Sequence, residues 1–240
     1  MQKIIYVGLA IILTFSYSKI ALTDDHVYGP YPITLKDYSG DKTNSVKYTG
    51  QMARHVLHDS LKSLVKTGDV NKMMAYYNGE DGLEIVAPKS KDDFIIKQTM
   101  VADIGSGNLS GKTYKGTISG WGNLTGKEVL EHMINKAGEV SRGFDPNTGF
   151  DYTQLISKFA MGAVFYNQAV NNYLGKKMEI GQKPNSEPYK EGAYYTGKEH
   201  SWDEAFGYWG SAAHALTLSA EQNYNVAKKK DMASADYNGD

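Results

Sequence analysis

The chain has 240 residues, of which 41% are hydrophobic and 22% charged, with a formal net charge of -1 at pH 7. This length can bury an ample core in one large domain, and a nearly neutral chain offers no basic field for a nucleic-acid partner. Cysteine is absent, which excludes disulfides, a thiolate nucleophile and zinc–cysteine sites.

The first 23 residues have the order of a secretory signal. Lys3 precedes a short apolar run, and small residues follow as far as Thr23. The run is shorter than the roughly 20 apolar residues that a membrane span needs, although a buried N-terminal helix is an alternative. We expect residues 1–23 to be a signal peptide and residues 24–240 to be one exported domain, periplasmic or at the cell surface, without a transmembrane span.

Two helices are expected near the start of the mature chain, from about Gln51 to Lys66 and from Asp69 to Tyr77. The first has apolar or small residues at helical spacing, namely Ala53, Val56, Leu57, Ser60, Leu61, Leu64 and Val65. It also carries His55 and His58, a pair that can in principle hold a metal from two rings one turn apart. Because the glutamate of the zinc-protease pattern is missing, two surface histidines are the favoured interpretation.

A glycine-rich segment, residues 78–126, separates these helices from the next. It has no long helical stripe and is predicted to be an irregular insertion. Helices resume where Thr125 and Glu128 form a capping-box pattern, in which each side chain accepts from an otherwise unpaired backbone N–H. The apolar stripe behind this start extends to Val140.

Two further helices complete the predicted fold. Asp151 and Gln154 make a second capping pattern, and the helix behind it is expected to extend to about Leu174. Its predicted stripe is Leu155, Phe159, Ala163, Tyr166, Val170 and Tyr173. A last helix is expected from about Trp202 to Lys228. The sequence therefore predicts a mostly α fold, a bundle of long amphipathic helices with one glycine-rich irregular insertion.

The stretch Gly197-Lys-Glu-His-Ser-Trp-Asp-Glu-Ala-Phe-Gly-Tyr208 admits two interpretations. Ser201 and Glu204 fit a third capping box, and Asp203 suits the positive end of a helix dipole, so no ligand is needed. The alternative is a metal site with a nitrogen ligand from His200 and an oxygen ligand from Asp203 or Glu204. On physical grounds alone both interpretations stay open.

Three stretches carry a family resemblance: residues 44–57 (NSVKYTGQMARHVL), 151–165 (DYTQLISKFAMGAVF) and 197–208 (GKEHSWDEAFGY). Together they resemble the secreted bacterial family known as domain of unknown function 4856. That family is similar in character to the imelysin-like proteins, exported helical-bundle proteins tied to iron acquisition, whose hallmark is Gly-x-His-x-x-Glu. The resemblance implies that His200 takes the place of the hallmark histidine and Asp203 that of the acid. The glycine lies one residue further from the histidine than in the hallmark.

The last five residues fit part of a calcium loop. Asp236, Asn238 and Asp240 provide the first three oxygen donors of the D-x-[DN]-x-[DN]-G pattern, and the sequence ends before the glycine and the distal acid. We expect this half-loop to bind calcium weakly or not at all, and the natural protein to continue beyond it. A polar tail is the alternative.

The leading hypothesis is an exported, metal-associated binding protein, with iron or zinc at the His200 cluster and calcium at the tail. It would take up a metal ion or small ligand together with envelope uptake proteins. One alternative is a metal-dependent hydrolase with Glu204 as the base, which needs a third protein ligand. The other is a glycan or protein adhesion module, since 18 tyrosines and three tryptophans offer stacking surfaces. Binding is favoured over catalysis.

Overall fold

The computed structural model describes residues 32–86, 98–182, 184–210 and 218–228. Within these ranges the chain is mostly α, as the sequence predicted, with one two-stranded sheet. The expected signal peptide and the expected calcium half-loop both lie outside the described residues. No helix among the described residues combines the length and the apolar character that crossing a membrane requires.

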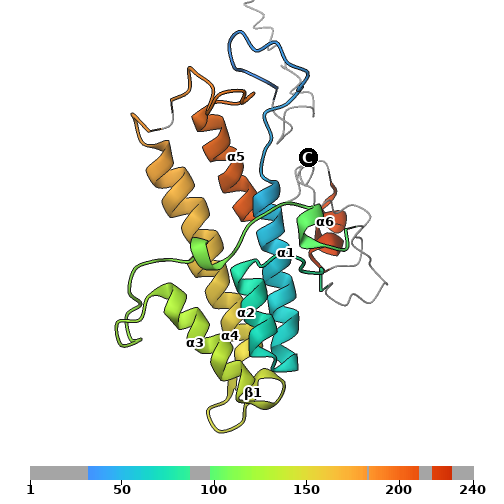
Figure 1. The fold of residues 1–240 in the computed structure, drawn as a ribbon, viewed down its shortest axis with the longest axis vertical. Helices are drawn as coiled ribbons and strands as arrows, with labels where there is room; N and C mark the ends of the chain where they lie inside the picture. Colours follow the sequence, from blue (N-terminus) through green and yellow to red (C-terminus); the bar gives the residue numbers. More distant parts are fainter. Residues whose placement is uncertain (1–31, 87–97, 183, 211–217, 229–240) are drawn as a thin grey trace, which may run out of the picture.

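The α-helices of the described residues are α1 (Thr49–Leu64), α2 (Val70–Asn78), α3 (Gly126–Gly138), α4 (Tyr152–Ala160), α5 (Gly197–Trp209) and α6 (Ala220–Ala227). The chain continues from α4 directly into η6 (Met161–Gly175), a π-helix. Figure 1 shows α4 and η6 as one long rod with α5 beside its upper half. Helix α1 packs against α2, α4 and α5 and is therefore the central element.

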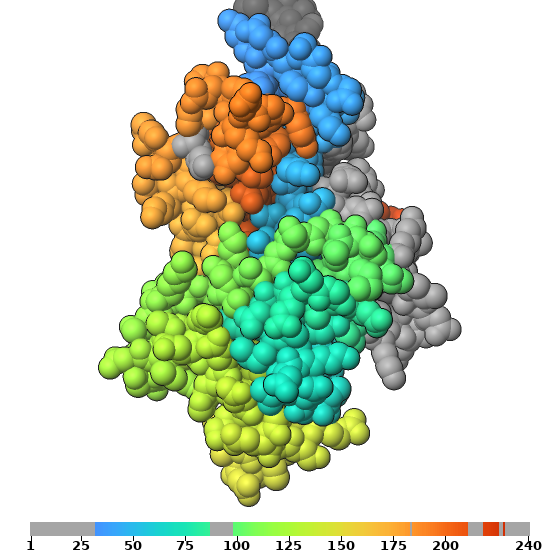
Figure 2. Space-filling view, viewed as in Figure 1, coloured from blue at the N-terminus to red at the C-terminus, as the bar shows by residue number. Residues whose placement is uncertain are grey.

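Short elements connect these helices. The 3-10 turns are η2 (Val65–Thr67), η3 (Val101–Asp103), η4 (Ser110–Lys112), η5 (Ser141–Gly143) and η7 (Lys176–Met178). Strand β1 (Phe144–Asp145) pairs antiparallel with β2 (Phe150–Asp151) in a hairpin between α3 and α4. In Figure 2 this hairpin region lies at one end of the molecule, and the first described residues meet the segment before α5 at the other.

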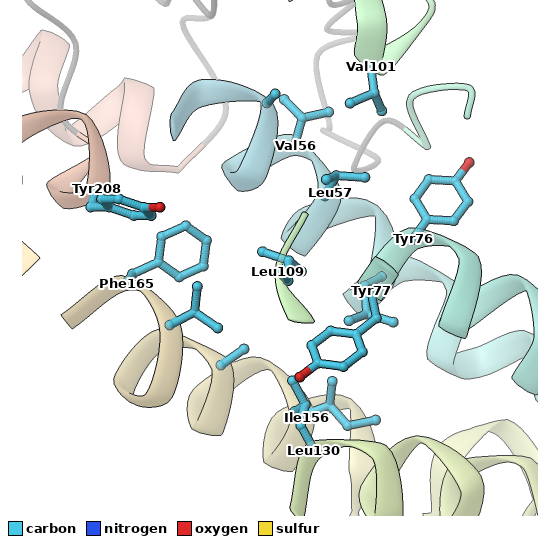
Figure 3. Packing of buried hydrophobic residues seen from close by; sticks show 14 of the residues in the cluster. Val56, Leu57, Tyr76, Tyr77, Val101, Leu109, Leu130, Ile156, Phe165 and Tyr208 are labelled. Carbon is cyan, nitrogen blue, oxygen red and sulfur yellow. The ribbon is translucent and has the colours of Figure 1, made fainter. Parts of the chain in front are cut away.

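The core forms where the predicted stripes of α1 and α3 meet α2 and α4. Leu57, Leu130 and Ile156 are fully buried there, and Figure 3 shows them around Tyr77. The hydroxyl of Tyr77 is 2.8 Å from that of Thr113, so this buried phenol has a polar partner. The stripes predicted for α1 and α3 are thus confirmed.

The glycine-rich segment covers this core without forming an α-helix in its described residues. The Leu109 amide donates to the Tyr77 carbonyl at 3.1 Å, and the Tyr114 amide donates to the Ala163 carbonyl at 2.7 Å. Leu109 itself is fully buried. The irregular chain therefore connects the end of α2 to η6 through backbone bonds and adds its own side chain to the core.

The capping box predicted at the start of α3 is confirmed. The Thr125 amide donates to the Glu128 carboxylate at 2.7 Å, and the Glu128 amide donates to the Thr125 hydroxyl at 3.3 Å. Asp151 likewise caps α4, accepting from the amides of Thr153 and Gln154. Local side-chain chemistry therefore determines where both helices begin.

The stripe predicted for the helix from Asp151 to Leu174 is right at Tyr173, which is buried, but wrong at Tyr166. Val164 and Phe165 are buried, whereas Tyr166 is 59% exposed. The reason is the change to π geometry at Met161, because a wider turn places a different set of residues on the buried face. A stripe extrapolated at α-helical spacing cannot follow that change.

The last predicted helix begins earlier and ends sooner than the sequence suggested. Thr196 and Glu199 form the capping box that starts α5, so the predicted Ser201–Glu204 box is wrong. The Ser201 hydroxyl instead donates to the Gly197 carbonyl at 2.8 Å, inside the helix. Helix α5 ends at Trp209, its C-cap Gly210 has a left-handed φ of 78°, and α6 is a separate helix.

Helix α5 approaches α1 very closely at Gly207. A Cβ at this position would lie 2.7 Å from Cβ of Tyr48 and 2.9 Å from Cβ of Gln51. Both distances are far shorter than an ordinary carbon–carbon contact of about 3.5–4.0 Å. Glycine at 207 therefore sets the separation of the two helices.

We expect Gly207→Ala to destabilise the fold by about 1–3 kcal/mol, because α5 must move away from α1. Gly162→Ala is the matched control, since a Cβ there meets nothing within 4 Å. The control should be neutral or up to about 1 kcal/mol stabilising. Urea unfolding followed by circular dichroism measures both. Equal effects of the two substitutions would contradict the close contact.

Candidate functional site

A polar cluster lies on the side of α5 that faces α1. Nε2 of His200 is 3.4 Å from Oε2 of Glu204, one helical turn further along. The other carboxylate oxygen, Oε1, accepts from the side-chain amide of Gln51 on α1 at 2.8 Å. The two predicted residues His200 and Glu204 are therefore brought together, and a third residue far away in the sequence orients the carboxylate.

The His200 ring contacts two tyrosines from the segment that precedes α5. The ring centroids of Tyr195 and His200 are 4.7 Å apart at an interplanar angle of 26°, and those of Tyr189 and His200 are 4.8 Å apart at 51°. The backbone of this segment is held by a bridge between Pro188 and Thr196. The imidazole thus has little freedom to rotate.

Asp203, the third predicted ligand on α5, makes a different contact. Its Oδ2 accepts from the backbone amide of Lys47 at 2.6 Å, while its buried Oδ1 has no hydrogen-bond partner among the described residues. Burial raises the pKa of Asp203 to about 7, although the hydrogen bond from Lys47 acts in the opposite direction. Asp203 therefore connects α5 to the chain that leads into α1.

The described residues contain no group of three histidine or acidic side chains arranged to hold a metal ion. His200 and Glu204 form a pair, and Asp203 does not join them as a third ligand. Asp236, Asn238 and Asp240 lie outside the described ranges, so calcium binding there stays a prediction.

Two tyrosines and an arginine surround the Glu204 side of the cluster. Burial, and after it the negative charge of Glu204, raises the pKa of Tyr173. The rings of Tyr173 and Tyr208 have centroids 5.6 Å apart, and the guanidinium carbon of Arg54 is 5.7 Å from the centre of the Tyr208 ring. Arg54 is fixed by bonds to the carbonyls of Gly50 and Asn108. These groups form a largely buried, mostly aromatic polar layer.

The interpretation of His55 and His58 as surface residues is wrong. His58 is buried and His55 is partly buried, and both line a cleft of about 580 Å³ between α1, the α4–η6 rod and the end of α5. The His55 ring stacks on Phe165 with centroids 4.4 Å apart. The physical reason is that η6 and α5 cover this side of α1, which no pattern within α1 reveals.

His55 also closes the end of α5. Its Nε2 is 2.9 Å from the Gly207 carbonyl, which lies in the last turn, where helix carbonyls lack intrahelical partners. Burial lowers the pKa of His55 to about 4, against the raising effect of that carbonyl. The imidazole is therefore neutral at pH 7, with its proton on the nitrogen that donates to the carbonyl.

Comparison with known proteins places the chain in one family. The family described as Domain of unknown function (DUF4856) matches residues 117–239, about half of the chain. The protein belongs to this DUF4856 family. No curated protein and no solved structure matches the chain. The DUF4856 match includes His200 and Glu204 but not Gln51 or His55, which α1 contributes. Imelysin-like character is not tested by these comparisons and stays a prediction.

Sequence reasoning missed the residues that position the His200–Glu204 pair. Gln51, Tyr189 and Tyr195 were not identified as parts of the site, although Gln51 and Tyr195 are buried. One signal was available for Gln51, because it is a polar residue two positions before the apolar stripe of α1 and within a stretch that resembles the family. The tyrosines precede a helix whose start was placed too late.

We expect the stability of the protein to fall on acidification, with His55 as one cause. Between pH 6.5 and about 4 the unfolded chain takes up a proton at His55 that the folded protein does not, so stability is lost as the pH falls through this window. His55→Gln should be less stable at pH 7.5, and its deficit should shrink by about 1–3 kcal/mol near pH 4.5. Urea unfolding at several pH values measures this difference.

Two features keep the measurement specific to His55. The raised pKa of Asp203 has the opposite effect on stability, because it favours the folded state as the pH falls through about 7. This contribution is the same in the variant and the wild type, so it cancels in their difference. His132→Gln, at a ring on α3 that contacts Trp121, is the control. A deficit that stays constant from pH 7.5 to 4.5 would show that His55 does not titrate in this way.

Proposed function

We propose that this protein binds a metal ion between His200 and Glu204. The observation that carries the proposal is the 3.4 Å separation of Nε2 and Oε2. A tetrahedral ion with bonds of about 2.0–2.2 Å to nitrogen and oxygen holds two such ligand atoms about 3.4 Å apart. Nε2 of His200 and Oε2 of Glu204 can therefore bind one ion without a large rearrangement of α5.

The surroundings of the pair support this function. Gln51 orients the carboxylate through its second oxygen, and two tyrosine rings hold the imidazole in place. Hydrogen bonds and packing behind the ligands are what fix their orientation in metal sites generally. A histidine nitrogen with a carboxylate oxygen suits zinc or iron better than calcium, which takes oxygen ligands.

Two protein ligands favour capture over catalysis. Catalytic zinc sites in hydrolases use three protein ligands and one open position, and no third histidine or acid joins the pair among the described residues. Two ligands leave about two positions for water or for groups that arrive with the metal. We therefore propose a binding protein and not a hydrolase. With the export that the expected signal peptide would give, it would serve metal uptake at the envelope.

Isothermal titration of the mature protein with zinc and ferrous ions tests the proposal. We expect one saturable site for at least one of these ions, and His200→Ala and Glu204→Gln should each weaken it by about tenfold or more. Calcium should not compete. Circular dichroism should show that both variants keep the fold, because neither side chain belongs to the apolar core.

Two matched variants separate the observed pair from the set that the sequence suggested. Asp203→Asn should leave the affinity for the metal unchanged, because Asp203 contacts the Lys47 amide and not the pair. His132→Ala removes an imidazole that lies elsewhere and controls for adventitious binding. No saturable site, or equal affinity in the wild type and His200→Ala, would refute the proposal.

A further inference from the structure

The cleft beside α1 has the size and the walls of a small-molecule site. Its volume of about 580 Å³ lies within the range of about 300–1,000 Å³ that is usual for ligand pockets. Six rings from α1, η6 and the end of α5 contribute to its lining: His55, His58, Phe165, Tyr166, Tyr208 and Trp209. Figure 3 shows Phe165 and Tyr208 directed toward each other across the gap between η6 and α5.

Apolar surface is left exposed among the residues that line this cleft. Trp209 is 73% exposed, Tyr166 59% and Met161 48%, although Phe165 beside them is buried. Single exposed apolar residues need no explanation, but several that line one concave surface indicate a binding site. Rings dominate over aliphatic groups in this lining, so the surface suits a flat aromatic ligand that can stack or pack edge-on.

The charged groups of the lining favour an anion. Lys62 and Lys158 contribute two positive charges, and Asp59 contributes one negative charge. The floor adds no charge at pH 7, since burial lowers the pKa of both His55 and His58. Besides burial, the negative charge of Asp59 raises the pKa of His58 and the positive charges of Lys62 and Lys158 lower it, so charges of both signs act on the buried end of the cleft, with two lysines against one carboxylate in the lining.

We propose that this cleft binds a small planar aromatic anion, with its rings against Phe165 and Trp209 and its carboxylate directed toward Lys62 and Lys158. This site is independent of the metal pair, because His200 and Glu204 do not line it. The protein would then have two ligand sites, one for a cation and one for an organic anion. If experiments refute binding at one of these sites, the proposal for the other still stands.

A series of probes with one ring system and three charges tests the proposal. The probes are naphthalene-2-carboxylate, naphthalene-2-carboxamide and naphthalen-2-ylmethylammonium, titrated calorimetrically into the mature protein without added metal. We expect the carboxylate to bind about three to ten times more tightly than the amide, since two solvated charges act on it. The ammonium probe should bind more weakly than the amide. Tighter binding of the ammonium probe, or equal binding of all three, would overturn the choice of an anion.

Variants assign the charge preference to named residues. The double variant Lys62→Met, Lys158→Met should bind the carboxylate and the amide equally, whereas Lys127→Met on α3, away from the cleft, should keep the preference. A preference that persists in the double variant would refute the role of these lysines. Lysine and methionine both have long apolar stems, so these substitutions keep the packing of the side chains at 62 and 158.

Further comparisons test the aromatic half of the proposal. Trp209→Ala should weaken naphthalene-2-carboxylate about fivefold or more, whereas Trp202→Ala, at an exposed tryptophan outside the cleft, should not. Decanoate, an aliphatic anion, and maltotriose, a neutral glycan, should both bind more weakly than naphthalene-2-carboxylate. Tighter binding of decanoate would make the cleft a fatty-acid site, and tighter binding of maltotriose a glycan site, and either result overturns the proposal.

Discussion

The close contact between α5 and α1 at Gly207 is the constraint on which the rest of the structure depends. Without a side chain there, the α5 backbone lies directly against Cβ of Tyr48 and of Gln51. The same contact brings the amide of Gln51 to Glu204 and the ring of His55 to the Gly207 carbonyl. A larger residue at 207 would separate the helices, and both polar contacts would lengthen together. The absence of a side chain at residue 207 therefore determines both the geometry around Glu204 and the contact of His55 with the end of α5.

The start of a helix was predictable where the sequence offered only one capping pattern nearby. Thr125 and Glu128 form the box that the sequence indicated. Before α5, however, two patterns of the same type lie five residues apart, one beginning at Thr196 and the other at Ser201. The earlier one forms, and the Ser201 hydroxyl then bonds back to a helix carbonyl, a local use of serine that competes with capping. Sequence spacing alone cannot choose between two equivalent boxes, because the choice depends on what the first turn packs against.

The candidate sites were predictable only in part, for a geometric reason. His200 and Glu204 lie four residues apart and so share a face of any α-helix, which sequence spacing does show. Asp203 is rotated away from Glu204 by about 100° on such a helix, and its partner is the Lys47 amide. The burial of His55 and its role at the end of α5 depend on η6 and α5, which are far away in the sequence. Tertiary contacts of this kind leave no periodic signal, and the change to π geometry shifts the spacing of the buried residues in η6 away from that of an α-helix.

The folded unit extends beyond the segment that matches the family. The match covers residues 117–239, yet Ala205 and Tyr208 of α5 are almost fully buried, and α1 is one of the helices that pack on α5. A chain that began at residue 117 would expose this apolar surface to water, at roughly 25 cal/mol per Å². It would also lose Gln51 behind Glu204 and His55 at the end of α5. The helix that carries the candidate metal pair thus needs α1 both for its burial and for the orientation of its carboxylate. Residues before the match are therefore part of the same structural unit as the site.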